Sequence, residues 1–176
     1  MTFRELRNLI AAGLSSYLCL PVSLSNQVDP EQPYPFVIYS VTTPYTPDSG
    51  LGEYYNQEQE DGSTTEIRIE QPTAAFSFTV CSGNRKTEQG YVLGDDEAME
   101  VAEKAMGWFL HAGYDYISSS GITVVDVSNV QERSTLQVDE AARRYGFDVI
   151  IRYVRKDERT INTIQDVNIL EKGDNK

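Results

Sequence analysis

The residue types that most often carry out catalysis are scarce in this chain. It has one histidine, His111, and two widely separated cysteines, Cys19 and Cys81, and no serine or cysteine motif lies beside the histidine. A general base must be oriented by further groups, so a lone histidine near a helix end is typical of a surface or dipole-complementing residue. These three residues also lack the paired spacing of a structural zinc site. We therefore expect neither histidine-based catalysis nor zinc.

The acidic and glycine-containing runs do not form a binding motif either. EQEDGS (58–63) and GDDEAME (94–100) lack the alternating ligands and terminal glutamate of a calcium loop. CSGNRKTEQGYVLG (81–94) matches neither GxxxxGK[ST] nor GxGxxG, so it encodes no phosphate cradle. We predict no cofactor and no metal. A carboxylate pair that cleaves glycosides stays open, because sequence does not give the distance between two acids.

Charge argues against free nucleic acid as a ligand. The 176-residue chain has a net charge of −12, which disfavours affinity through release of counterions from DNA. Eleven tyrosines without an interleaved basic patch suit a surface partly covered by neighbouring proteins better than a nucleic-acid platform.

The charges are distributed unevenly along the chain. One segment is rich in acidic residues, namely Glu53, Glu58, Glu60, Asp61, Glu66 and Glu70, and another is rich in basic residues, namely Arg143, Arg144, Arg152, Arg155, Lys156 and Arg159. Two surfaces of opposite sign could meet there, or both could be solvated faces.

The cysteines fit a reducing cytoplasm, and the hydrophobic pattern argues against export and membrane insertion. Cys19 and Cys81 are each expected to be small core residues rather than a disulfide. No run of eighteen apolar residues occurs, and charged residues interrupt the first helix, so we expect no signal peptide and no membrane span.

The first half of the chain predicts a helix followed by three strands. Thr2 and Glu5 have capping-box spacing, and an apolar stripe runs from there to Pro21, which stops the helix. The stripe consists of Leu6, Leu9, Ile10, Gly13, Leu14, Tyr17 and Leu18. Strands are expected at 33–43, 64–71 and 74–82, the first of them central in a sheet. Residues 44–62 predict a long loop or an extended hairpin that moves or contacts a partner; a disordered insertion is the alternative.

The second half repeats this order. A helix is expected from Asp95 or Asp96 to Gly113, with a buried stripe at Met99, Ala102, Ala105, Met106, Phe109 and Leu110. Strands are expected at 122–131, 145–155 and 159–170, joined by turns at DEAARR (139–144) and KDER (156–159). The expected elements therefore follow the order α-β-β-β-α-β-β-β. Residues 1–170 make a single domain, and 171–176 are a frayed tail.

Residues 129–155 carry the clearest strand pattern. Phe147, Val149, Ile151 and Tyr153 alternate with Asp148, Ile150, Arg152 and Val154. One face is apolar and predicts core, whereas the mixed face is free to meet a partner.

Three segments carry a resemblance to a known family: the ERS...DE..RRYGFDV run, the opening TFRELRNLIAAGL, and the SNQ...PYPFVIYSV segment. In type and order they resemble the neck or tail terminator proteins of tailed bacteriophages. The resemblance implies an α+β fold, with a mixed or antiparallel β-sheet packed against two main helices. It also implies a structural virion protein that is not an enzyme. Such subunits form a closed ring, commonly a hexamer, that caps the tail tube and joins it to the head. The implied partners are further copies, the tail tube protein and the head-completion (connector) protein; DNA passes through the channel without specific binding, and no membrane is involved. The implied location is the neck or tail of the virion, after assembly in the host cytoplasm.

A closing ring needs two unlike, complementary sides on each subunit. We expect Arg133, Arg143, Arg144 and Arg152 on the positive side, and Glu58, Glu60 and Asp61 with Tyr54 and Tyr55 on the other. A local salt bridge to Glu132, Asp139 or Glu140 is the alternative for each arginine. Two other functions stay open: a small cytoplasmic ligand-binding domain or enzyme with a carboxylate site, and a monomeric structural or regulatory protein of the same architecture.

Overall fold

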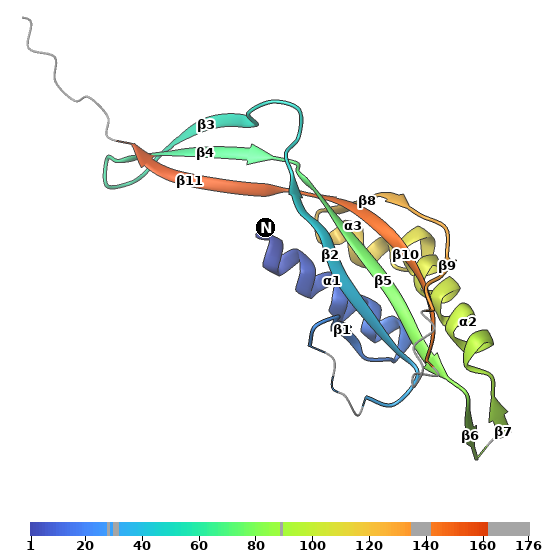
Figure 1. Ribbon diagram of the computed structural model, residues 1–176. Coiled ribbons are helices and arrows are strands. Elements are labelled where there is room, and N and C mark those ends of the chain that lie inside the picture. The colour runs from blue at the N-terminus through green and yellow to red at the C-terminus, as the bar shows by residue number, and fades with distance from the viewer. Residues whose placement is uncertain (28, 30–31, 89, 135–141, 162–176) are drawn as a thin grey trace, which may run out of the picture.

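The computed structural model describes residues 1–27, 29, 32–88, 90–134 and 142–161 (Figure 1). The expected frayed tail, most of the DEAARR turn and the end of the 159–170 strand lie outside these residues. The fold is α+β, as predicted, and the main elements follow the predicted order with several short ones added. The elements are α1 (Phe3–Leu18), β1 (Val22–Leu24), β2 (Phe36–Thr46), β3 (Glu53–Glu58), β4 (Thr64–Glu70), β5 (Thr73–Gly83), β6 (Arg85–Thr87), β7 (Gly90–Val92), α2 (Gly94–Gly107), a π-helical turn η1 (Trp108–Ala112), α3 (Tyr114–Ser119), β8 (Ile122–Val127), β9 (Gln131–Glu132), β10 (Ala142–Tyr153) and β11 (Arg155–Ile161).

The main sheet has the strand order β1-β2-β5-β10-β8, with β9 paired to β10. Only β1 and β2 pair in parallel, so the sheet is mixed. The alternation read from the sequence is confirmed in β5 and β10, where Phe78 lies opposite Phe147 and both are buried. Helices α1 and α2 share one apolar core with this face of the sheet (Figure 1). The opposite face, which carries Asp148, Ile150 and Arg152, is exposed along β10.

Helix α1 begins at the predicted capping box. The Thr2 hydroxyl accepts from the Glu5 amide at 3.3 Å, and the Glu5 carboxylate accepts from the Thr2 amide at 2.8 Å. Its buried residues match most of the predicted stripe: Leu6, Ile10, Gly13, Leu14 and Leu18. The expectation of a buried Cys19 is wrong. This residue is the helix C-cap, in the left-handed conformation at φ 57°, and its side chain is exposed, whereas Cys81 is buried as predicted.

The second helix differs from its prediction in extent and in buried face. Helix α2 ends at Gly107, a π-helical turn follows, and Gly113 joins that turn to α3 rather than ending the helical region. Met99 and Leu110 are exposed by 40% and 61%. The buried positions are Ala98, Ala102, Ala105, Trp108 and Phe109. Small alanines let the helix approach the sheet closely. The extra residue in a π-helical turn also changes which of the following side chains point toward the sheet.

Strands β11, β4 and β3 form a separate three-stranded sheet, which we call the arm. The arm projects from the end of the main sheet where β2, β5 and β10 run out (Figure 1). Within residues 44–62, for which a long loop or an extended hairpin was expected, β3 pairs antiparallel with β4 throughout its length. The predicted KDER turn is wrong: residues 156–159 lie within β11, which pairs antiparallel with β4. Asp157 and Arg159 form ion pairs across to β4, and Lys156 pairs with Glu158 along β11, so the charges do not interrupt the strand.

Candidate functional site

The three predicted acidic residues lie together at the tip of the arm. Glu58 ends β3, and Glu60 and Asp61 lie in the turn to β4; all three are exposed. Asp61 accepts from the Ser63 hydroxyl at 2.6 Å and from its amide at 2.9 Å, and these bonds hold the pKa of Asp61 below its ordinary value. Among the described residues, no arginine or lysine forms an ion pair with any of the three. Within the described part of the chain, the tip therefore presents negative charge that no ion pair neutralises.

The two predicted tyrosines stand on opposite faces of β3. Tyr54 lies opposite Arg68 in the register and is 53% exposed. Tyr55 lies opposite Ile67, which is only 1% exposed, and is itself 45% exposed. Cross-strand neighbours on one face pack against each other, so Tyr55 helps cover Ile67 while both rings stay accessible to a neighbour.

Several residues of the two opposite charge clusters pair with each other inside the arm. Arg159 binds Glu66 at 2.5 Å, and the Arg68 guanidinium binds Asp157 at 3.1 Å and also Glu70. Arg155 adds ion pairs to Asp157 at 3.1 Å and to Glu70 at 3.7 Å. These groups stabilise the arm internally. The acids at the tip and Arg152 on the main sheet take part in none of the ion pairs found among the described residues, which leaves them for contact with a neighbour.

Arg133 is bound within its own chain. Its guanidinium donates to the Ser77 hydroxyl at 2.6 Å and the Thr79 hydroxyl at 3.2 Å, and forms an ion pair with Asp148 at 2.9 Å. Burial alone would raise the pKa of Asp148, but hydrogen bonds from Ser77 and Arg133 outweigh it, so the pKa lies below its ordinary value. The local pair is thus with Asp148 rather than with Glu132, and the other two proposed partners, residues 139 and 140, lie outside the described residues.

The other three predicted arginines lie on β10, but on two faces. Arg143 falls on the helix-bearing face and lines a surface pocket with Asp95, Asp96 and Glu132. Arg144 and Arg152 fall on the opposite face, near the two ends of the strand. In the sheet register, Arg144 lies opposite Cys81 of β5, and Arg152 lies opposite Thr73 of β5 on one side and Thr123 of β8 on the other. The structure therefore does not gather the four arginines into one surface.

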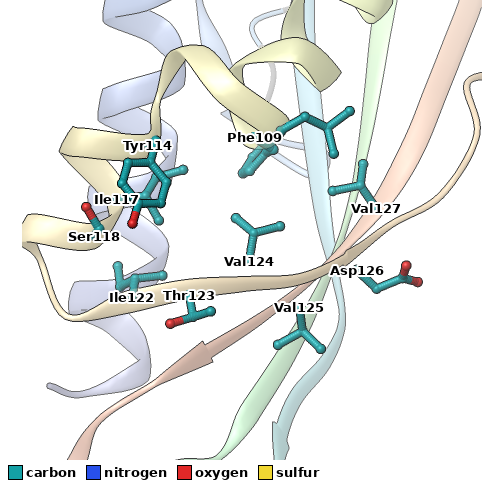
Figure 2. Close-up of a pocket in the computed structure, with 11 residues that line it drawn as sticks. Phe109, Tyr114, Ile117, Ser118, Ile122, Thr123, Val124, Val125, Asp126 and Val127 are labelled. Carbon is teal, nitrogen blue, oxygen red and sulfur yellow. The ribbon is translucent and has the colours of Figure 1, made fainter.

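One surface feature was missed by the sequence reasoning. A groove of about 460 Å³ runs between β8 and the segment formed by η1 and α3 (Figure 2). Its lining is mostly apolar and includes Phe109, Leu110, Tyr114, Ile117 and Val124. The apolar run ITVVDV predicted a strand, but nothing in it shows that this strand lies at a sheet edge beside a helix. Pairing partners far away in the chain decide that.

The described residues contain no recognisable catalytic or metal-binding cluster. His111 is exposed at the end of the π turn, and in the ranges given above no three residues among His, Cys, Asp and Glu cluster so that they could hold a metal ion. In the same part of the chain, none of the helices combines the length and the apolar composition needed to cross a bilayer.

The geometry thus consists of a projecting arm with an acidic tip and exposed tyrosines along β3, and a main sheet with exposed arginines and an apolar groove, which suits contact with other proteins. Comparison with curated proteins finds no match. A family model described as "Phage neck terminator protein" matches residues 3–175, nearly the whole chain, in agreement with the resemblance seen in its sequence. The chain therefore belongs to the phage neck terminator protein family, a family of structural proteins of the phage neck.

Proposed function

We propose that this chain is the subunit of a closed ring, with six copies, that caps the tail tube and joins it to the head. As a phage neck protein it is part of the virion and associates with other head and tail components. The single observation that carries the proposal is the arm, because a sheet that projects from the subunit body exposes surface that the other described residues do not cover (Figure 1).

Unlike surfaces on the two parts of the subunit support a ring. The arm tip carries Glu58, Glu60 and Asp61 without cationic partners among the described residues, whereas Arg152 is exposed on the main sheet. A head-to-tail interface between unlike surfaces closes into a ring when the rotation between subunits divides a full turn. Opposite charges would fix the register of this contact and disfavour wrong partners.

The remaining partners follow from this role. The two rims of the ring would meet the tail tube protein and the head-completion protein, after assembly in the host cytoplasm. DNA would pass through the channel. A net charge of −12 repels phosphate, so DNA would slide through without being held.

The proposal is tested with the purified full chain. Light scattering at several concentrations should give the mass of six subunits, and negative-stain images should show rings with a central channel. If only compact monomers appear at every concentration, and the neck of the virion shows no ring that antibodies against this chain label, the proposed function is wrong.

A further inference from the structure

Strand β8 is a free edge of the main sheet. It pairs with β10 on one side, and no other described strand pairs with its second side. Its six residues, ITVVDV, contain no proline or lysine, and Asp126 is their one charge. Proteins normally protect such an edge with charged residues, proline or a covering segment, because its unpaired amides and carbonyls invite another strand.

The groove beside this edge offers a place for side chains of an added strand. In Figure 2, Val124 and Val127 point toward Phe109 on the helical side, while Val125 points to the opposite side of β8. Val125 is 46% exposed, and the groove residues Leu110 and Tyr114 are exposed by 61% and 68%. Large apolar groups gathered beside an open strand edge mark a protein contact.

The arm carries the matching free edge. Strand β3 pairs only with β4 among the described strands, all six of its residues are exposed, and it has the same length as β8. Six residues of strand extend about 20 Å. Its side chains include the exposed rings of Tyr54 and Tyr55, on alternate faces. An added strand places alternate side chains on the two sides of the sheet, so one ring would enter the groove and the other would cover the open face.

Charge selects the orientation of the two strands. Arg152 lies opposite Thr123, near the start of β8, whereas Asp126 lies near its end. If β3 runs antiparallel to β8, the acidic tip that follows Glu58 arrives at the start of β8, the end of the strand where Arg152 of β10 lies across from Thr123. If it runs parallel, the tip arrives beside Asp126, and like charges repel.

From these observations we infer that strand β3 of a second copy docks antiparallel along the free edge of β8, with a tyrosine in the adjacent groove. This inference rests on the proposed ring and names its subunit contact. The occupant is a second copy because each chain carries both unlike edges, which is what a ring of identical subunits requires. Pairing of β8 with β8 would leave the arm unused and would stop at a dimer.

Cysteine pairs test this contact. All chains carry Cys19→Ser to remove the exposed thiol, while the buried Cys81 is kept. Chains with Thr123→Cys are co-expressed with chains that carry either Gln57→Cys or Glu53→Cys, and are then oxidised and resolved on non-reducing gels. Arg4→Cys, exposed on α1, replaces the arm cysteine in the control. Circular dichroism shows that each variant folds.

The inference predicts a mixed dimer of Thr123→Cys with Gln57→Cys at a yield at least ten times that with Glu53→Cys or Arg4→Cys. Rings that form without this cross-link would overturn the inference and leave the proposed function standing. A Thr123–Thr123 cross-link, or a preference for residue 53, would also overturn it. Monomers without any cross-link would overturn both.

Discussion

At the scale of single residues, Gly146 lies on the open face of the main sheet, the face turned away from the helices, and its neighbours leave no room there for a side chain. A Cβ atom there would lie 2.3 Å from the Phe78 carbonyl oxygen and 2.9 Å from Nη1 of Arg133. We expect Gly146→Ala to lower the free energy of unfolding by about 1–3 kcal/mol, measured by urea denaturation, because the backbone must shift to admit the methyl group. Gly107→Ala is the control: its Cβ meets nothing within 4 Å, and its backbone is helical. It should be neutral or stabilise by about 0.5–1 kcal/mol. Equal effects at the two positions would contradict this description of the open face.

Glu97 makes stability depend on pH. Arg85 donates to its two carboxylate oxygens at 2.7 and 2.8 Å, and this hydrogen bonding lowers the pKa of Glu97 despite partial burial. A carboxylate with a lowered folded-state pKa stabilises the fold above its ordinary value of 4.5, and this contribution is lost as the pH falls through the folded-state pKa. Urea midpoints between pH 7 and pH 3 should therefore fall on the acidic side, and Glu97→Gln should flatten that fall. Glu103→Gln, at an exposed position of α2, should not, and an identical pH dependence in all three proteins would contradict the role of Glu97.

Among the candidate site residues, charge and position in the chain could be read from the sequence, but partners could not. The acids at 58, 60 and 61 lie together because they are near neighbours in the chain, at the end of β3 and in the turn that follows. Arg133 and Asp148 meet only because β9 and β10 pair and Ser77 lies on the adjoining strand. Such contacts depend on register between distant segments, which local sequence does not encode.

At the scale of elements, the root of the arm is held by the carboxylate of Glu70, which is only 4% exposed. It accepts from the Tyr45 hydroxyl at 2.8 Å and binds the guanidinium of Arg68. We expect Glu70→Ala to destabilise the arm by about 1–3 kcal/mol, because it leaves a hydroxyl and a cation without their acceptor. Hydrogen exchange should become faster at amides of β4 and β11 and stay unchanged in β5. Glu53→Ala, at an exposed position of β3, should alter none of these rates. Uniformly faster exchange in the main sheet after Glu70→Ala would show that the arm is not an independently anchored element.

Elements with a strong apolar period were predictable, and elements held by other forces were not. The stripe of α1 and the alternation of β5 and β10 face one large core, so their hydrophobic pattern reports their burial. In α2, Ala102 is buried as expected, but Met99 was also expected to be buried, and close approach to the sheet buries the smaller Ala98 while Met99 stays exposed. Strand β11 has no alternation of apolar and polar residues. It is held to β4 partly by ion pairs, and no buried apolar face is needed.

At the scale of the whole molecule, association is expected to depend on charges that the subunit does not neutralise itself. We predict that Arg152→Glu weakens self-association at least tenfold, measured by analytical ultracentrifugation, because it replaces the exposed cation opposite Thr123 at the start of β8 with an anion. Arg4→Glu changes the net charge equally at an exposed position of α1 and should leave association unchanged. Adding Glu58→Arg to Arg152→Glu should restore much of the loss. Equal weakening by both single variants would indicate a general charge effect and not a defined contact.

The role in the virion is tested most directly in the phage itself, with the gene for this chain inactivated. Electron microscopy of lysates should then show filled heads separate from tails, and tails without a regular end, while supply of the intact chain restores joined particles. Tails of normal length joined to heads in the complete absence of this chain would contradict its role as the subunit that closes the tail and links it to the head.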